Sequence, residues 1–270
     1  MSNSTAKSTA KLQLSNIIYI YSFDCAIKNL GICCVSINTK WQEELNSSTQ
    51  QLYELYDSNC NKDEFLTRAL TIVTNINDTL NSRFKLEWTN VIDLIPGKKV
   101  MEVKFPVILR KLKYVLHFLN KTLPPAKYVL IENQMSINDK ARGVSRYIEE
   151  YYTPLQELES GITIGLEKYP LTITPLTKHE LTSNLAELFI VQPSLKNSHQ
   201  IDPSELGSYA TYISKYTNYT ANKKHTTANF VYYMKIMGKS DEIENINNKL
   251  NDIADAFMMA YAWCKNKNII

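Results

Sequence analysis

Apolar residues occur along this chain in two patterns, as short continuous runs and as residues spaced three and four positions apart. An unbroken apolar and aromatic run at 17–23 ends in Asp24 and is typical of a strand buried on both faces. A second β-branched run follows at 30–37 after a short turn, and the two runs together predict a hairpin. Later runs predict further strands at 86–95, 128–131 and 171–174.

Apolar residues three and four positions apart predict helices elsewhere. These helices are expected at 64–80, 106–119, 144–158 and 243–264. Pro106 suits the first turn of the second helix, and Pro154 is expected to bend the third. Because strands and helices alternate after residue 85, we expect an α/β fold whose mixed sheet is flanked by helices on both faces.

The chain length permits one elaborated domain. It has 270 residues, of which 44% are hydrophobic, so it can bury a sizeable core. Residues 1–15 are rich in Ser and Thr and are expected to be a disordered tail, with a weak likeness to a transit peptide. We expect a single domain over 16–268, with insertions at about 41–84 and 180–221, for which the sequence suggests no role.

Charge and cysteine content narrow the class of partner. The net charge of +3 does not by itself indicate a polyanion, so any nucleic-acid surface must be local. Five cysteines without a CxxC pair indicate free thiols and an intracellular, reducing compartment. The chain has no apolar run of the roughly 18–20 residues that cross a bilayer, so no membrane partner is expected. No small-molecule cofactor is expected either.

Four carboxylates have neighbours that predict burial. Asp24 and Glu132 each follow a buried strand, while Asp252 and Asp255 lie three positions apart on one face of the last helix. Unpaired buried carboxylates are unfavourable, and Mg²⁺ is the usual reason for several to converge. Each acid also has a plainer interpretation: a turn residue at Asp24, a partner of a nearby cation at Glu132, and first-turn acids in the helix.

The motifs that carry these acids resemble those of RuvC-like Holliday junction resolvases, which have the RNase H-like fold. The resemblance is greatest to the poxvirus and fungal mitochondrial branch. It depends on SFDCAIKNLG (22–31), VLIENQ (129–134) and NDIADAF (251–257), with support from ARGVSRYIEEYY (141–152) and NKKHTTANFVYYM (222–234). The chain departs from the family pattern at Cys25, usually aliphatic, and at Ala26, where Gly is common.

This resemblance implies a homodimer that binds a four-way DNA junction and nicks two opposing strands symmetrically. Each active site would hold two Mg²⁺ ions, or Mn²⁺ as a substitute, through Asp24, Glu132, Asp252 and Asp255. Resolvases of this kind also use a lysine. We expect it to be Lys224 or its neighbour Lys223, with Lys178 as second choice, although each could be a solvated surface residue.

Basic residues near these motifs are the expected contacts to DNA phosphates. They are Lys28, Arg142, Arg146, Lys178, Lys223 and Lys224. A further basic run at 110–113 has two interpretations: it contacts phosphates, or it is the solvent-exposed face of an amphipathic helix. The family branch implies a viral replication site in the host cytoplasm or nucleus, with the mitochondrion as alternative. An RNase H acting on RNA–DNA hybrids, or a junction-binding protein without catalysis, remains open at this point.

Overall fold

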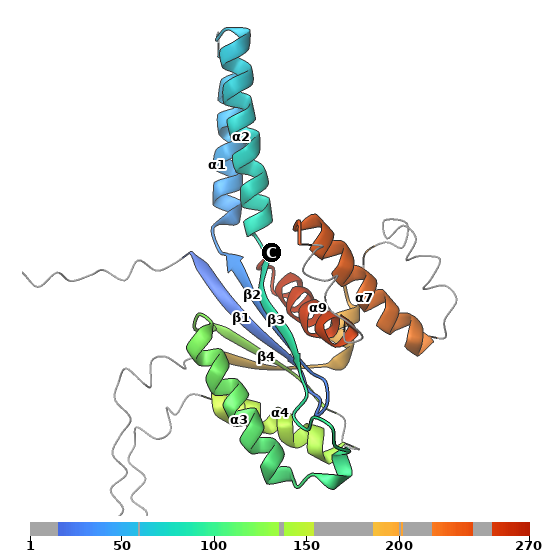
Figure 1. The fold of residues 1–270 in the computed structure, drawn as a ribbon. Coiled ribbons are helices and arrows are strands. Elements are labelled where there is room, and N and C mark those ends of the chain that lie inside the picture. The colour runs from blue at the N-terminus through green and yellow to red at the C-terminus, as the bar shows by residue number, and fades with distance from the viewer. Residues whose placement is uncertain are drawn as a thin grey trace, which may run out of the picture.

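The structure is a computed structural model that describes residues 16–58, 60–134, 138–153, 186–199, 201, 218–239 and 250–270. A five-stranded mixed sheet, with the strand order β3-β2-β1-β4-β5, forms its centre (Figure 1). The first three strands pair antiparallel, and β4 and β5 continue the sheet parallel to β1. The strands are β1 (Ile17–Asp24), β2 (Leu30–Asn38), β3 (Lys85–Ile92), β4 (Tyr128–Glu132) and β5 (Glu187–Val191).

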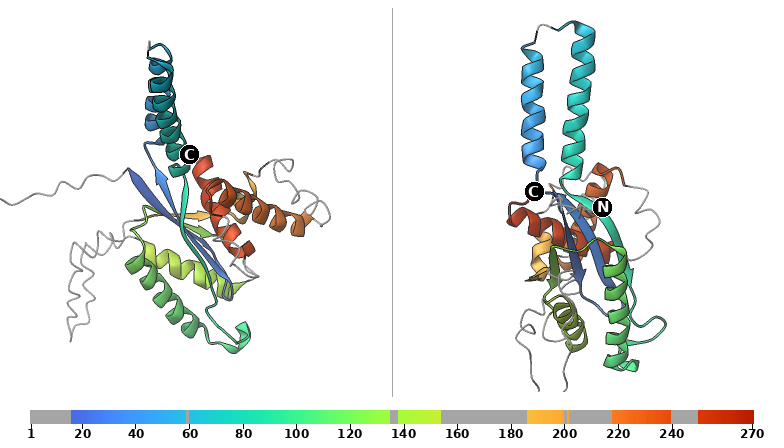
Figure 2. Two further views of the ribbon diagram at one scale, coloured as in Figure 1. Left: turned by 45° about the horizontal axis from the view of Figure 1, so that its top comes forward. Right: turned by 90° about the vertical axis from the view of Figure 1, so that its left-hand side faces the viewer.

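Helices cover both faces of this sheet, as Figure 2 shows from two further directions. The helices α7 (Asn218–Ile236) and α9 (Leu250–Asn266) lie on one face, where Phe230 and Phe257 belong to a buried apolar cluster. The helices α3 (Phe105–Thr122) and α4 (Asp139–Tyr152) lie on the other face over a second cluster. The predicted α/β class, a mixed sheet with helices on both faces, is confirmed.

Sequence signals at the helix ends explain where several of these helices start and stop. The side chain of Asn138 accepts a hydrogen bond from the backbone N–H of Ala141 at 3.1 Å, which caps α4 and starts it earlier than predicted. The helix α3 has Pro106 in its first turn and ends at Thr122, before two prolines. The predicted extensions of α4 beyond 153 and of α9 before 250 lie outside the described residues.

A pair of helices between β2 and β3 projects from one end of the sheet (Figures 1 and 2). These are α1 (Trp41–Tyr56) and α2 (Lys62–Ser82), and they fill the segment expected as the first insertion. The indole N–H of Trp41 donates to the carbonyl of Ile269 at 3.2 Å, and the Arg83 guanidinium lies over the Trp41 ring. The base of this hairpin is therefore tied to the body of the protein.

The second expected insertion, 180–221, needs correction. Part of it is the strand β5, which pairs with β4, and the short 3₁₀ helix η3 (Pro193–Asn197) follows directly. The strand was not recognised because its five residues show no clear alternation, with a burial pattern that changes along its length. The strand predicted at 171–174 and the tail predicted at 1–15 lie outside the described residues. In the described part of the chain, no helix combines the length and apolarity needed to span a bilayer.

Candidate active site

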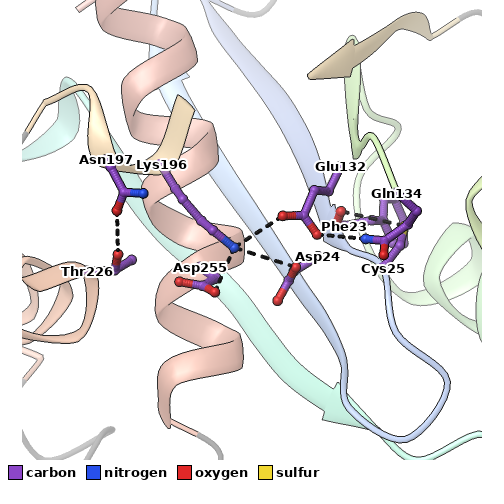
Figure 3. A network of polar contacts seen from close by, with 9 residues as sticks. All are labelled: Phe23, Asp24, Cys25, Glu132, Gln134, Lys196, Asn197, Thr226 and Asp255. Carbon is purple, nitrogen blue, oxygen red and sulfur yellow. Dashed lines mark hydrogen bonds and ion pairs between the residues drawn. The ribbon is translucent and has the colours of Figure 1, made fainter. Parts of the chain in front are cut away.

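Two carboxylates meet because β1 and β4 are parallel neighbours. Asp24 is the last residue of β1 and Glu132 the last residue of β4, and Phe23 pairs in register with Ile131 just before them. Strands that run in the same direction bring their carboxyl ends to the same edge of a sheet. The side chains of Asp24 and Glu132 therefore lie side by side (Figure 3).

The helix α9 brings the third carboxylate to this edge. Asp255 is buried, and α9 lies directly against β1 and β2. Gly31 permits the close contact, because a Cβ atom there would overlap the backbone carbonyl of Asp252. Gly31 is also the register partner of Asp24. The position of one glycine thus controls how near the helix comes to the strand that carries Asp24.

A lysine joins the three carboxylates. The Lys196 Nζ lies 2.7 Å from Asp255 Oδ2, 3.2 Å from Glu132 Oε1 and 3.9 Å from Asp24 Oδ1 (Figure 3). Lys196 belongs to η3, which contacts α9, and its side chain is only 17% exposed. Residues from β1, β4, η3 and α9 therefore form one cluster of charges.

Polar neighbours hold this cluster in place. The Gln134 Nε2 donates to Glu132 Oε2 at 2.8 Å, so both oxygens of that carboxylate have partners. The Thr226 hydroxyl of α7 donates to the Asn197 side chain at 3.1 Å, which fixes η3 next to Lys196. These contacts orient the charged groups before any ligand is present.

The pKa shifts follow from burial and from these contacts. Burial and a hydrogen bond with Glu132 raise the pKa of Asp24 well above its usual value. Burial also raises the pKa of Glu132, but its hydrogen bond with Asp24 and the charge of Lys196 outweigh this and lower it overall. Burial raises the pKa of Asp255 despite the opposing effect of Lys196. Burial lowers the pKa of Lys196, yet the three carboxylates together raise it, so the ammonium form persists.

The cluster has more acidic than basic groups. If all three carboxylates ionise, one ammonium leaves two negative charges uncompensated, which corresponds to the charge of one divalent cation. The Asp255 Oδ1 is buried and has no hydrogen-bond partner. Within the described residues, however, no three His, Cys, Asp or Glu side chains are spaced as ligands of one metal ion. The oxygen donors thus suit a hard cation chemically, while Lys196 lies where they converge.

The structure brings together only some of the residues expected at this site. Asp24, Glu132 and Asp255 meet at Lys196. Asp252 is half-buried in the first turn of α9, with its backbone against Gly31.

One departure from the family pattern, Cys25, lies directly after the carboxylate of Asp24. Cys25 is buried, and burial raises the pKa of its thiol well above the usual value. Its Sγ donates to the Phe23 carbonyl at 3.7 Å. The neutral thiol takes the place of an aliphatic side chain.

The lysine among the carboxylates was expected to be Lys224, and the structure has Lys196 there. Lys223 and Lys224 lie half-buried in α7, and the charge of Lys223, like that of Lys196, opposes the rise that burial causes in the pKa of Asp255. Lys178, the second choice, lies outside the described residues. The missed signal was a short apolar run, LFIV, followed by a proline turn and a lysine.

The expected phosphate contacts have different surroundings. Lys28 is exposed in the turn between β1 and β2, and Arg146 is exposed on α4. Arg142 pairs with Asp139 at 2.6 Å, on the same helix. The buried Ser145, beside Arg146, donates to the Glu132 backbone carbonyl at 3.4 Å. The helix that carries both arginines therefore contacts the strand end that forms the site.

Comparison with known proteins supports the resemblance seen in the motifs. Residues 209–267 match the family model described as Poxvirus A22 protein. This match confirms the likeness to the poxvirus branch, and it includes the helix that carries Asp252 and Asp255. A search of the curated proteins finds no match to the chain.

Among solved structures, the chain is similar to the crystal structure of the fowlpox virus Holliday junction resolvase. The two share 12% sequence identity, with a TM-score of 0.44, over 93% of this chain and 99% of that chain.

Proposed function

We propose that this protein is a metal-dependent endonuclease that resolves four-way DNA junctions. The observation that carries the proposal is the convergence of Asp24, Glu132 and Asp255, from three separate elements, on one half-buried lysine. A group of buried carboxylates is unfavourable for folding unless a cation compensates it. Its placement at the carboxyl ends of two parallel strands is that of a ligand site in an open α/β sheet.

Asp24, Glu132 and Asp255 are the residues that would hold Mg²⁺ or Mn²⁺, with Asp252 one turn away on α9. When bound, two such ions would activate the attacking water and stabilise the leaving oxygen. The buried and unpartnered Asp255 Oδ1 supports this assignment, because a metal ion would supply its missing contact.

Lys196 would act on the substrate itself. Its ammonium group stays charged because the carboxylates raise its pKa. Beside the scissile phosphate it would stabilise the negative charge that develops during in-line attack. Gln134, which donates to Glu132, would keep that carboxylate ionised and oriented.

The choice of a branched substrate is supported by the sequence resemblance and by the family match over 209–267. Symmetrical resolution needs two cuts, and each chain supplies one cluster of carboxylates. We therefore infer a homodimer. Poxviruses replicate in the host cytoplasm, which is the compartment we propose.

The test is cleavage of three labelled substrates in Mg²⁺: an immobile four-way junction, a matched linear duplex and an RNA–DNA hybrid. We expect paired nicks at symmetrical positions of the junction and none in EDTA. Asp255→Asn should abolish nicking, whereas the control Asp139→Asn, which changes an exposed acid on α4, should not.

Each alternative gives a distinct result. Cleavage of the hybrid in preference to the junction would show an RNase H activity. Tight binding of the junction without nicks, in wild type and in Asp255→Asn alike, would show a junction-binding protein. Equal cutting of all three substrates would overturn the assignment as a resolvase.

A further inference from the structure

The helix α3 has one face in the core and one face in solvent. Its buried side chains, Ile108, Leu112, Leu116 and Leu119, are inaccessible to solvent and fix the orientation of the helix. The opposite side carries the residues that we call the basic face of α3: Lys104, Arg110, Lys111, Tyr114, Phe118 and Lys121. All six are exposed.

The basic face has no acidic counterpart. The eighteen residues of α3 contain no Asp or Glu, and none of its cations has a carboxylate within ion-pair distance in the described part of the chain. The exposed side of α2 differs, because Arg68 pairs there with Glu64 at 3.6 Å. Most surfaces mix both signs of charge, so a face of one sign indicates a partner of the opposite sign.

Two aromatic side chains lie among these cations. Tyr114 is 70% exposed and Phe118 is 55% exposed, and they stand one turn apart between Lys111 and Lys121. Rows of cations with aromatic side chains between them bind nucleic acids, since the cations contact phosphates and the rings stack on bases. From Lys104 to Lys121 the face is roughly 25 Å long, the length of about seven base pairs.

The start of α3 is connected to the carboxylate site by contacts that both regions make with α4. The Lys140 Nζ of α4 donates to the carbonyls of Val100 and Val103, at 2.7 and 3.1 Å, just before α3 begins. Gly143 of α4 lies so close to the Phe105 ring that a Cβ atom would overlap it. The same stretch of α4 contacts the end of β4 through Ser145. The start of α3 is therefore connected through α4 to the strand end that carries Glu132.

We propose that the basic face of α3 binds the sugar-phosphate backbone of one arm of branched DNA, with Tyr114 and Phe118 packed against its sugars or unpaired bases. The identity of this substrate rests on the proposed function. Binding through α3 would orient the junction relative to the carboxylates without taking part in the cleavage chemistry.

The test compares two triple variants that lose the same charge. Arg110→Gln, Lys111→Gln and Lys121→Gln remove cations from the basic face, and the control Lys40→Gln, Lys62→Gln and Arg68→Gln removes them from the α1–α2 hairpin. Binding of a labelled four-way junction is measured in EDTA, where no cleavage occurs, at several salt concentrations. The α3 variant should bind roughly 10- to 100-fold more weakly, with a slope of log K against log salt that is reduced by about 2–3. The control should bind as wild type does.

A double variant tests the aromatic residues. Tyr114→Ala with Phe118→Ala should weaken junction binding by about 10-fold, while the salt slope stays that of wild type. Analytical ultracentrifugation and binding to vesicles of anionic phospholipid are measured alongside. If the double variant changes the oligomeric state and leaves DNA affinity intact, the face is an interface between copies of this chain, and the proposal fails. Vesicle binding that is lost in the α3 variant while junction binding persists would overturn it as well.

Failure of this inference is distinct from failure of the proposed function. Junction binding that depends on α3, in a protein that never nicks, would support the inference and refute the endonuclease. Normal nicking with full DNA affinity in the α3 variant would refute the inference alone.

Discussion

Replacing Lys196 by methionine removes the ammonium group that lies among the two buried carboxylates of Glu132 and Asp255 and the half-buried one of Asp24. At an effective dielectric constant of 20, two unit charges 4 Å apart interact by about 4 kcal/mol. The three carboxylate oxygens lie 2.7, 3.2 and 3.9 Å from Nζ, so each gross interaction is at least of this size. Desolvation offsets most of it, and removal of one partner from a buried ion pair lowers the free energy of unfolding by about 3–5 kcal/mol. We expect a loss of this size for Lys196→Met at pH 8 in EDTA.

The loss should depend on pH and on metal. Without Lys196 the pKa values of the three carboxylates rise, so protonation relieves their repulsion as the pH falls. The difference from wild type should therefore be smaller at pH 5 than at pH 8. Mg²⁺ that binds the folded state should restore part of the stability, because it replaces the missing positive charge. Nicking should be lost.

Urea unfolding, followed by tryptophan fluorescence and circular dichroism at both pH values, measures these differences. Lys140→Met is the matched control, because Lys140 donates only to the neutral carbonyls of Val100 and Val103. Its loss should be about 1–3 kcal/mol and should not vary with pH or Mg²⁺. If Lys196→Met destabilised the protein equally at pH 5 and pH 8, the argument from charge compensation would be refuted.

Three further substitutions test the geometry around this lysine. Gly31→Ala should push α9 away from β2, lower the free energy of unfolding by about 1–3 kcal/mol and slow nicking, which thermal unfolding and junction cleavage would detect. Asp24→Asn removes a carboxylate whose raised pKa makes its ionised form oppose folding above that pKa. In EDTA at pH 8 the free energy of unfolding should therefore increase, and the melting temperature should rise by about 2–4 °C for each kcal/mol of that increase. The rise should be smaller at pH 4. Nicking should be abolished. A melting temperature equal to or below that of wild type at pH 8 would contradict this. Gln134→Leu removes a hydrogen-bond donor to Glu132, so the pKa of that carboxyl group should rise. The acid limb of the plot of nicking rate against pH should then move to higher pH. At neutral pH the nicking rate should be about 10-fold lower. An unshifted acid limb would show that Gln134 does not act on Glu132.

Local patterns in the sequence were enough to locate most of the sheet and two of its acids. The apolar runs before Asp24 and Glu132 predicted β1 and β4, and the carboxylates at their ends follow from the same runs. The helix α2 was predicted from its spacing of apolar residues, and α9 from an apolar stretch without Pro or Gly. These features are visible in a sequence because burial imposes a short period on consecutive residues.

The sequence by itself therefore determined the α/β class, the acids at the strand ends and the resemblance carried by the motifs around them. Only the tertiary structure decided which lysine joins Asp24, Glu132 and Asp255. Lys196 follows a short strand of weak pattern, and its role depends on the pairing of β5 with β4 and on the packing of η3 against α9. Lys196 is 59 positions from Asp255 and 172 positions from Asp24 in the sequence. Contacts between residues so far apart produce no local period that a sequence pattern could reveal. The free energy that holds this half-buried ammonium among carboxylates arises only after the chain has folded, because it is an interaction between distant elements and not a property of any one segment.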